Sequence, residues 1–223
     1  MIRKCPLVTN EYYHVFNKSI AGFRIFNNGN EYNKMMHTIL YYQIQDPGCS
    51  FAQFTRHAEI PTQELKQYFI SLASEGEKLV EILAYCLMPT HVHFILRQRM
   101  ERGISIFMGN ILNSYARYFN VKYKRFGPLW ASRFKAVLIE DIEQMSHLTR
   151  YIHLNPTTAN LGYNPEDWLY SSYREYLGEI EQGQCISLRE NIIDMTSQDY
   201  RKFVEDQIDY QKNLAVIRRQ IFE

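Results

Sequence analysis

Two apolar runs, "KLVEILAYCLM" at residues 78–88 and "HVHFILRQ" at residues 91–98, decide the fold. Only Pro89 and Thr90 separate them. Strand-like runs joined by such a short connection are typical of an antiparallel β-hairpin. The sequence therefore predicts a hairpin over residues 78–98.

The segments around this hairpin alternate between strand-like and helical patterns. The last predicted helix has Asp141 as its N-cap and ends near Asn155-Pro156, because proline disfavours the helical conformation of the residue before it. The order of elements predicts an α+β fold with helices on one face of a mainly antiparallel sheet. Strands are expected at 11–20 and late in 125–140, and helices at 31–44, in parts of 51–78, at 104–123 and at 141–154, before a mostly helical tail.

Charge is unevenly distributed along the 223 residues, although the formal net charge is only +1. Residues 102–139 contain seven basic residues and no acidic one, and we call this segment the basic block. Residues 164–223 contain twelve acidic and seven basic residues. A basic centre with an acidic tail points to a polyanionic partner.

No signal peptide and no long apolar segment is recognisable in the sequence. The four cysteines are scattered and form no Cys-x-x-Cys pair. We therefore expect a cytoplasmic protein without a membrane partner.

The hairpin contains a His-x-His pair, His91 and His93. Residues two apart share one face of a strand, with Cα atoms roughly 6–7 Å apart. Two imidazoles on one face can hold a divalent metal if a third ligand arrives from elsewhere. The alternative is a pair of surface or hydrogen-bonded histidines.

The segment "RYIHLNP" at 150–156 offers candidates for the missing groups. Tyr151 and Asn155 are four residues apart and so share one helix face. An amide oxygen can ligate a hard cation, and a tyrosine hydroxyl beside that cation can act as a nucleophile. A tyrosine ordinarily ionises near pH 10, so this role needs a cationic environment. The alternative is that Tyr151 is a core aromatic.

Three motifs in this order, "YCLMPTHVHFIL" (85–96), "KRFGPLWASRFKAVLIED" (124–141) and "YIHLNPTTANL" (151–161), resemble the single-tyrosine HUH transposases. The resemblance is greatest to the branch of REP-associated tyrosine transposases. It implies a ferredoxin-like (RRM-like) catalytic domain over residues 1–163, followed by a helical C-terminal extension over 164–223. It also implies Mg²⁺ or Mn²⁺ as cofactor and single-stranded DNA with a hairpin as partner.

Carried over to this chain, the resemblance makes His91 and His93 the metal pair, Asn155 the third ligand and Tyr151 the nucleophile. The implied reaction is metal-dependent cleavage and strand transfer through a 5′-phosphotyrosine intermediate, at hairpins of repeats or insertion-sequence ends. His153 should face away from this site and has no predicted ligand role.

Other readings of the function stay open at this point. One is a domesticated protein that binds DNA or RNA hairpins without cutting them. Another is a metal-dependent hydrolase in which Tyr151 is only structural. The resemblance allows a monomer or a homodimer, associated with the nucleoid when bound to DNA.

Basic and aromatic side chains near the predicted site are candidates for DNA contacts. Basic residues supply phosphate contacts, whereas aromatic rings can stack on unpaired bases. The predicted DNA-binding residues are Arg117, Lys122, Lys124, Arg125, Trp130, Arg133, Lys135 and Arg150.

Overall fold

The computed structural model describes residues 6–57, 60–61, 64–188 and 194–213. Every strand and helix expected before residue 160 is present within a few residues of its expected position. The elements are β1 (Tyr12–Lys18), η1 (Ile20–Gly22), α1 (Gly29–Tyr42), α2 (Phe51–His57), α3 (Leu65–Glu75), β2 (Val80–Met88), β3 (His91–Gln98), α4 (Gly103–Lys122), β4 (Lys135–Leu138), α5 (Ile142–Thr158), η2 (Pro165–Asp167), α6 (Tyr173–Tyr176), η3 (Gln182–Gln184) and α7 (Ser197–Glu205).

The four strands form one sheet in the order β2-β3-β1-β4, and every neighbouring pair is antiparallel. The predicted hairpin is the β2–β3 pair, and β3 pairs with β1 on its other side. The order β1, α1, β2, β3, α4, β4 is that of a ferredoxin-like fold. The predicted α+β class is confirmed.

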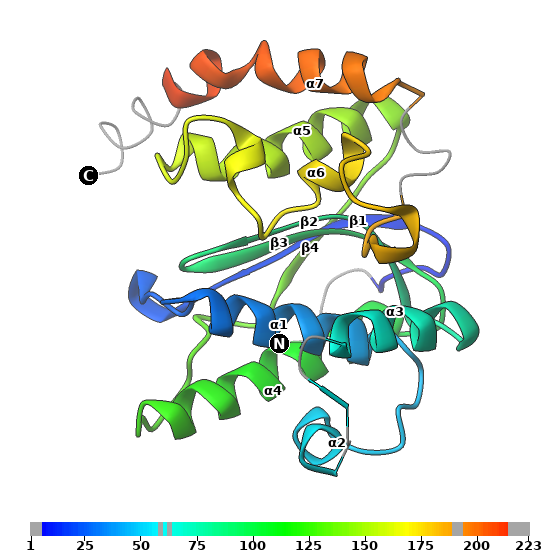
Figure 1. Ribbon diagram of the computed structural model, residues 1–223, viewed down its shortest axis with the longest axis vertical. Helices are drawn as coiled ribbons and strands as arrows, with labels where there is room; N and C mark the ends of the chain where they lie inside the picture. The colour runs from blue at the N-terminus through cyan, green and yellow to red at the C-terminus, as the bar shows by residue number, and fades with distance from the viewer. Residues whose placement is uncertain (1–5, 58–59, 62–63, 189–193, 214–223) are drawn as a thin grey trace.

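Helices cover both faces of the sheet (Figure 1). Phe94 of β3 belongs to the core between the sheet and the helices α1 and α4. The next residue, Ile95, belongs to a second core with Met145 and Ile152 of α5. The expectation of helices on one face therefore holds for α1 and α4 but not for α5. Since β3 buries apolar side chains on both faces, both faces need a covering layer.

The helix α5 does not end at Asn155 as predicted but continues through Pro156. The turn that contains both residues is buried, and the backbone N–H of Ala159 donates to the carbonyl of Asn155 at 3.0 Å. Burial of this turn outweighs the local preference of the residue before proline. Tyr151 and Asn155 consequently lie on one regular helix, which Asp141 caps as predicted.

The C-terminal extension packs on the sheet and on α5. The backbone N–H of Ser172 donates to the carbonyl of Tyr85 in β2 at 3.0 Å, and α7 lies over α5 (Figure 1). Residues 164–188 form short turns rather than the mostly helical structure expected, and α7 is the main helix of the described extension. The division of the chain at residue 163 stays a prediction.

Candidate active site

Three histidines lie together on the face of the sheet that α5 covers. His91 and His93 come from β3, with ring centroids 5.0 Å apart. His14 comes from the neighbouring strand β1, and its ring stacks on His93 at 5.4 Å. No spacing pattern in the sequence selects His14, because a single histidine in a strand can be linked to the pair only once the register of β1 against β3 is known.

Each histidine of the predicted pair uses its Nδ1 atom in a hydrogen bond. His91 Nδ1 lies 2.9 Å from Thr90 Oγ1, and His93 Nδ1 lies 3.1 Å from His14 Nε2. If His93 donates to His14, the lone pair of His93 Nε2 is available to a ligand. In that tautomer His14 is the acceptor that fixes His93, in the manner of an outer-shell partner of a metal-binding histidine.

All three imidazoles are neutral at neutral pH. Burial lowers the pKa of His14 to about 4, and burial with the nearby charge of Lys18 lowers the pKa of His91 to about 4. Burial and the two neighbouring imidazoles hold the pKa of His93 well below its ordinary value. A neutral imidazole is the form that ligates a metal.

The hydroxyl-bearing ring of Tyr151 approaches this group from α5. Its centroid lies 6.0 Å from that of His93 and 6.4 Å from that of His14, and both pairs meet edge to face. Tyr151 is half-buried, so its ring packs against the sheet while part of it stays accessible. The structure thus brings together the predicted nucleophile and the predicted histidine pair.

Asn155 follows Tyr151 by one turn of α5 and is 8% exposed. Met145, at the start of α5, lines the same pocket as Tyr12 of β1. Tyr12 pairs with Arg97, which lies at the end of β3 opposite to His91. The helix therefore runs toward the His91 end, and Asn155 lies on the His91 side of Tyr151. Its buried Nδ2 atom has no hydrogen-bond partner among the described residues.

These residues fit a divalent cation. The described residues contain no cluster of three His, Cys, Asp or Glu side chains that would form a complete metal site alone. Two imidazoles and one amide oxygen would form an incomplete set of ligands, which leaves coordination positions for a phosphate and water. An unpaired buried amide is costly unless a ligand engages it.

Residues 51–155 match the family model described as transposase, IS200-like. This segment contains β3 with its histidine pair and α5 with both Tyr151 and Asn155. The match supports the predicted transposase family.

No curated protein matches the chain. Among solved structures, a REP-associated tyrosine transposase bound to a REP hairpin is 15% identical, with a TM-score of 0.46. The match covers 88% of this chain and 95% of that chain. Within the part of the chain that the structure describes, no helix is long and apolar enough to cross a membrane.

The C-terminal extension packs against the side of α5 that faces away from the sheet. The ring nitrogens of His153 lie 2.7 Å from Tyr200 Oη and 2.7 Å from Ser172 Oγ, and the side chain is fully buried. His153 therefore contacts Ser172, the N-cap residue of α6, and Tyr200 of α7.

Arg150 also faces the extension rather than the histidines. Its guanidinium lies 4.1 Å from the ring centroid of Phe203, donates to the Phe203 carbonyl at 3.3 Å and lies 2.7 Å from His147 Nδ1. These contacts already engage the guanidinium, and the phosphate contact predicted for Arg150 stays a prediction. We do not include Arg150 in the proposed DNA surface.

The remaining predicted DNA-binding residues lie in different parts of the structure, on β4, on α4 and in the loop between these elements. Lys135 pairs with Phe16 across β1 and β4, and the ring of Phe16 stacks on His93 at 5.8 Å. Lys18, which the prediction omitted, pairs with His91 across β1 and β3. Lys18 and Lys135 are thus the basic residues that the strand register places beside the histidines, and both are exposed.

Other members of the basic block have different surroundings. The exposed Arg133 precedes β4, whereas Lys124 and Arg125 follow α4 in a turn where Arg125 donates to Asn120 Oδ1 at 2.8 Å. The Trp130 indole donates to the carbonyl of Leu112 at 3.0 Å, so it anchors its loop to α4. Arg117 and Lys122 lie on α4, which packs against the opposite face of the sheet from the histidines.

Proposed function

We propose that the chain cleaves single-stranded DNA beside a hairpin and rejoins it through a 5′-phosphotyrosine link at Tyr151. The hairpin belongs to a repeat or to the end of an insertion sequence, as in the REP-associated branch that the motifs resemble. The observation that supports this proposal is the approach of Tyr151 to the histidine pair, with 6.0 Å between the ring centroids of Tyr151 and His93.

The reaction is a balanced exchange of one phosphodiester for another. The Tyr151 hydroxyl oxygen loses its proton and attacks phosphorus, the bond from phosphorus to the 3′ oxygen breaks, and that oxygen takes up a proton to become a free 3′-hydroxyl. The phosphate remains joined to the 5′ side of the DNA and to tyrosine. Attack by the 3′-hydroxyl of a second strand reverses the exchange, so rejoining needs no nucleotide cofactor.

In this proposal the surrounding residues have distinct roles. His91, His93 and Asn155 hold Mg²⁺ or Mn²⁺, which when bound polarises the scissile phosphate. His14 keeps the Nε2 lone pair of His93 free by accepting the hydrogen bond at Nδ1. Lys18 and Lys135 contact phosphates on either side of the cleaved bond.

We further propose that one chain suffices for cleavage, because Tyr151 and the histidines meet within a single chain. The protein would act in the cytoplasm and associate with the nucleoid while bound to DNA.

The test is incubation with labelled hairpin DNA that carries a single-stranded extension, with Mn²⁺, followed by a denaturing gel. A protein–DNA band that is absent with Tyr151→Phe is expected. Retained binding without any adduct would instead support a non-cleaving binder. Cleavage that survives in Tyr151→Phe would support a hydrolase in which Tyr151 is structural.

A further inference from the structure

A groove of about 870 Å³ lies on the face of the molecule opposite the histidines. Residues of α1, α2 and α4 and of the loop 45–50 line it. In Figure 1, α2 and α4 lie below the sheet and α5 lies above it. The groove is therefore separate from the candidate active site.

The groove is strongly cationic. Its lining contains Lys34, Arg56, Arg117 and Lys122, against a single acidic residue, Asp46. Asp46 uses Oδ1 to accept a hydrogen bond from the backbone of its own loop at 3.0 Å. Because the buried Glu31 offsets the charge of Lys122, the field that attracts anions comes mainly from Lys34, Arg56 and Arg117, although the whole chain is nearly neutral.

Three of these cations have no anionic partner in the described part of the chain. Within the described ranges, no carboxylate lies at ion-pair distance from Lys34, Arg56 or Arg117. Lys34 is half-buried, with Nζ 4.1 Å from the ring centroid of Phe51, and burial lowers its pKa. The contact with the Phe51 ring offsets part of the cost of burying this ammonium, and an external anion would offset more of it.

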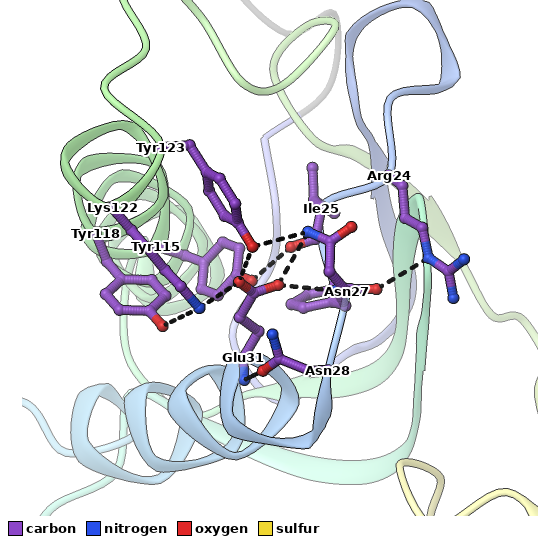
Figure 2. Close-up of polar contacts among 10 residues, drawn as sticks. Arg24, Ile25, Asn27, Asn28, Glu31, Tyr115, Tyr118, Lys122 and Tyr123 are labelled. Atoms are coloured by element: carbon purple, nitrogen blue, oxygen red, sulfur yellow. Dashed lines mark hydrogen bonds and ion pairs between the residues drawn. The ribbon is translucent and has the colours of Figure 1, made fainter.

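The fourth cation is fixed in place by a buried carboxylate (Figure 2). Lys122 Nζ lies 2.6 Å from Glu31 Oε1, which also accepts a hydrogen bond from Tyr123 Oη at 2.5 Å. Glu31 itself is fully buried between the start of α1 and the end of α4. The end of the groove is therefore rigid rather than formed by a mobile surface lysine.

The remaining lining offers hydrogen-bond donors rather than exposed rings. Asn110, Asn113 and Ser114 lie with Arg117 on one side of α4, at helical spacing. This stripe continues to Val121, a distance of about 16 Å, or roughly five base-pair steps of duplex. The lining ring of Tyr42 is buried and that of Tyr118 is half-buried, so the groove has no open platform for unpaired bases.

We propose that this groove binds the phosphate backbone of the duplex stem of the hairpin. The inference rests on the proposed function for the identity of the DNA, but not on the cleavage chemistry. Amides, hydroxyls and unpaired cations on a straight helix suit phosphates of a duplex and read no sequence. The stem is then held on one face of the protein while its single-stranded extension reaches the histidines on the other.

The test measures binding of a fluorescent blunt hairpin without cleavage, in EDTA and over a series of salt concentrations. The variant is Arg56→Gln/Arg117→Gln, and the control is Lys66→Gln/Lys202→Gln, which removes the same charge elsewhere. The groove variant should bind about tenfold more weakly, and its salt slope should fall by about 1 for each residue replaced. The control should differ from the wild type by no more than about twofold, and all proteins should share one unfolding midpoint.

Two results would overturn the proposal. One is a groove variant with the affinity and salt slope of the control. The other is an equal loss for an unpaired oligonucleotide of the same length, which would exclude specific binding of the stem. Neither depends on adduct formation at Tyr151, so failure of the cleavage proposal would be seen separately in the denaturing gel.

Discussion

The two faces of the sheet carry two kinds of chemistry. Beneath α5, the buried His14 and His93 and the half-buried His91 have lowered pKa values, and a buried amide lies one turn from a tyrosine. On the opposite face, cations line an open groove, and three of them lack a carboxylate partner among the described residues. The first set is neutral and enclosed, and the second is charged and accessible.

This difference indicates that the groups for bond breaking and the groups for DNA affinity can lie on separate faces of one small domain. Neutral metal ligands in a low-dielectric site suit coordination of a cation that binds a single phosphate. Fixed charges in an open groove suit many weak phosphate contacts that supply affinity. We therefore expect substitutions on the histidine face to change adduct formation, and substitutions in the groove to change binding.

The largest effect is expected from Tyr151→Phe and His93→Ala. Each should lower adduct formation by about a thousandfold or more, because each removes a group that the chemistry requires. A mixture of the two inactive proteins should stay inactive, because tyrosine and histidines meet within one chain. The readout is the yield of covalent protein–DNA complex on a denaturing gel.

Both proteins should still bind a blunt hairpin with wild-type affinity, since the groove is intact. Recovery of adduct in the mixture would show instead that α5 is exchanged between subunits. Loss of hairpin binding in either variant would show that the two faces are not independent.

A smaller effect is expected from His14→Ala. Without His14 as acceptor, the tautomer and orientation of His93 are no longer fixed, and Mn²⁺ affinity should fall by about 10- to 100-fold. Titration calorimetry with Mn²⁺ measures this directly, without DNA. High Mn²⁺ should restore adduct formation in His14→Ala but not in His93→Ala.

Two further variants make this result specific. His14→Gln retains an acceptor and should lose less affinity than His14→Ala. His57→Ala, an exposed histidine on α2, should bind Mn²⁺ like the wild type. Equal losses in His14→Gln and His14→Ala would contradict the role of His14 as an acceptor.

Much of the histidine face could be predicted from local pattern. The two-residue periodicity of a strand places His91 and His93 on one side, and helical spacing places Tyr151 and Asn155 on one side. These are short-range consequences of backbone geometry. The family resemblance then linked the two segments, which spacing alone could not do.

What escaped prediction depends on long-range register and packing. The role proposed for His14 follows from the pairing of β1 with β3, and the contact of Arg150 with Phe203 follows from the packing of α7 against α5. The residues of the basic block are contiguous in the sequence. In the structure, those on α4 and Lys135 on β4 lie on opposite faces of the sheet. Contiguity along the chain says little about contiguity on the surface when a helix and a strand intervene.

A smaller effect, on the stability of the face that carries the groove, is expected from Glu31→Gln. Burial alone would raise the pKa of Glu31, but hydrogen bonds from Lys122, Tyr123 and Asn27 outweigh it and lower the pKa. The ionised carboxylate therefore stabilises the fold, and its loss should reduce the free energy of unfolding by about 2 kcal/mol at pH 7. Denaturant titration measures this change.

The pH dependence of this difference has a defined sign. The stabilisation by Glu31 is complete above its ordinary pKa, about 4.3, and is lost as the pH falls through the lower pKa of the folded state. The gap between the wild type and Glu31→Gln should therefore narrow at acid pH. Glu101→Gln, at an exposed position, should show no comparable gap at pH 7, and a gap of constant size in Glu31→Gln would contradict the assignment.

The smallest effect is expected from Tyr200→Phe, which removes the hydroxyl 2.7 Å from His153 Nδ1 and leaves a buried ring nitrogen without that partner. We expect a loss of about 1 kcal/mol in the free energy of unfolding. Because His153 holds the outer side of α5, the rate of adduct formation at saturating DNA should also fall several-fold, with hairpin affinity unchanged. The exposed Tyr210→Phe is the matched control and should change neither quantity. If Tyr200→Phe lowers stability but leaves the rate at the wild-type value, then the extension stabilises α5 without positioning Tyr151, and the catalytic face is independent of α7.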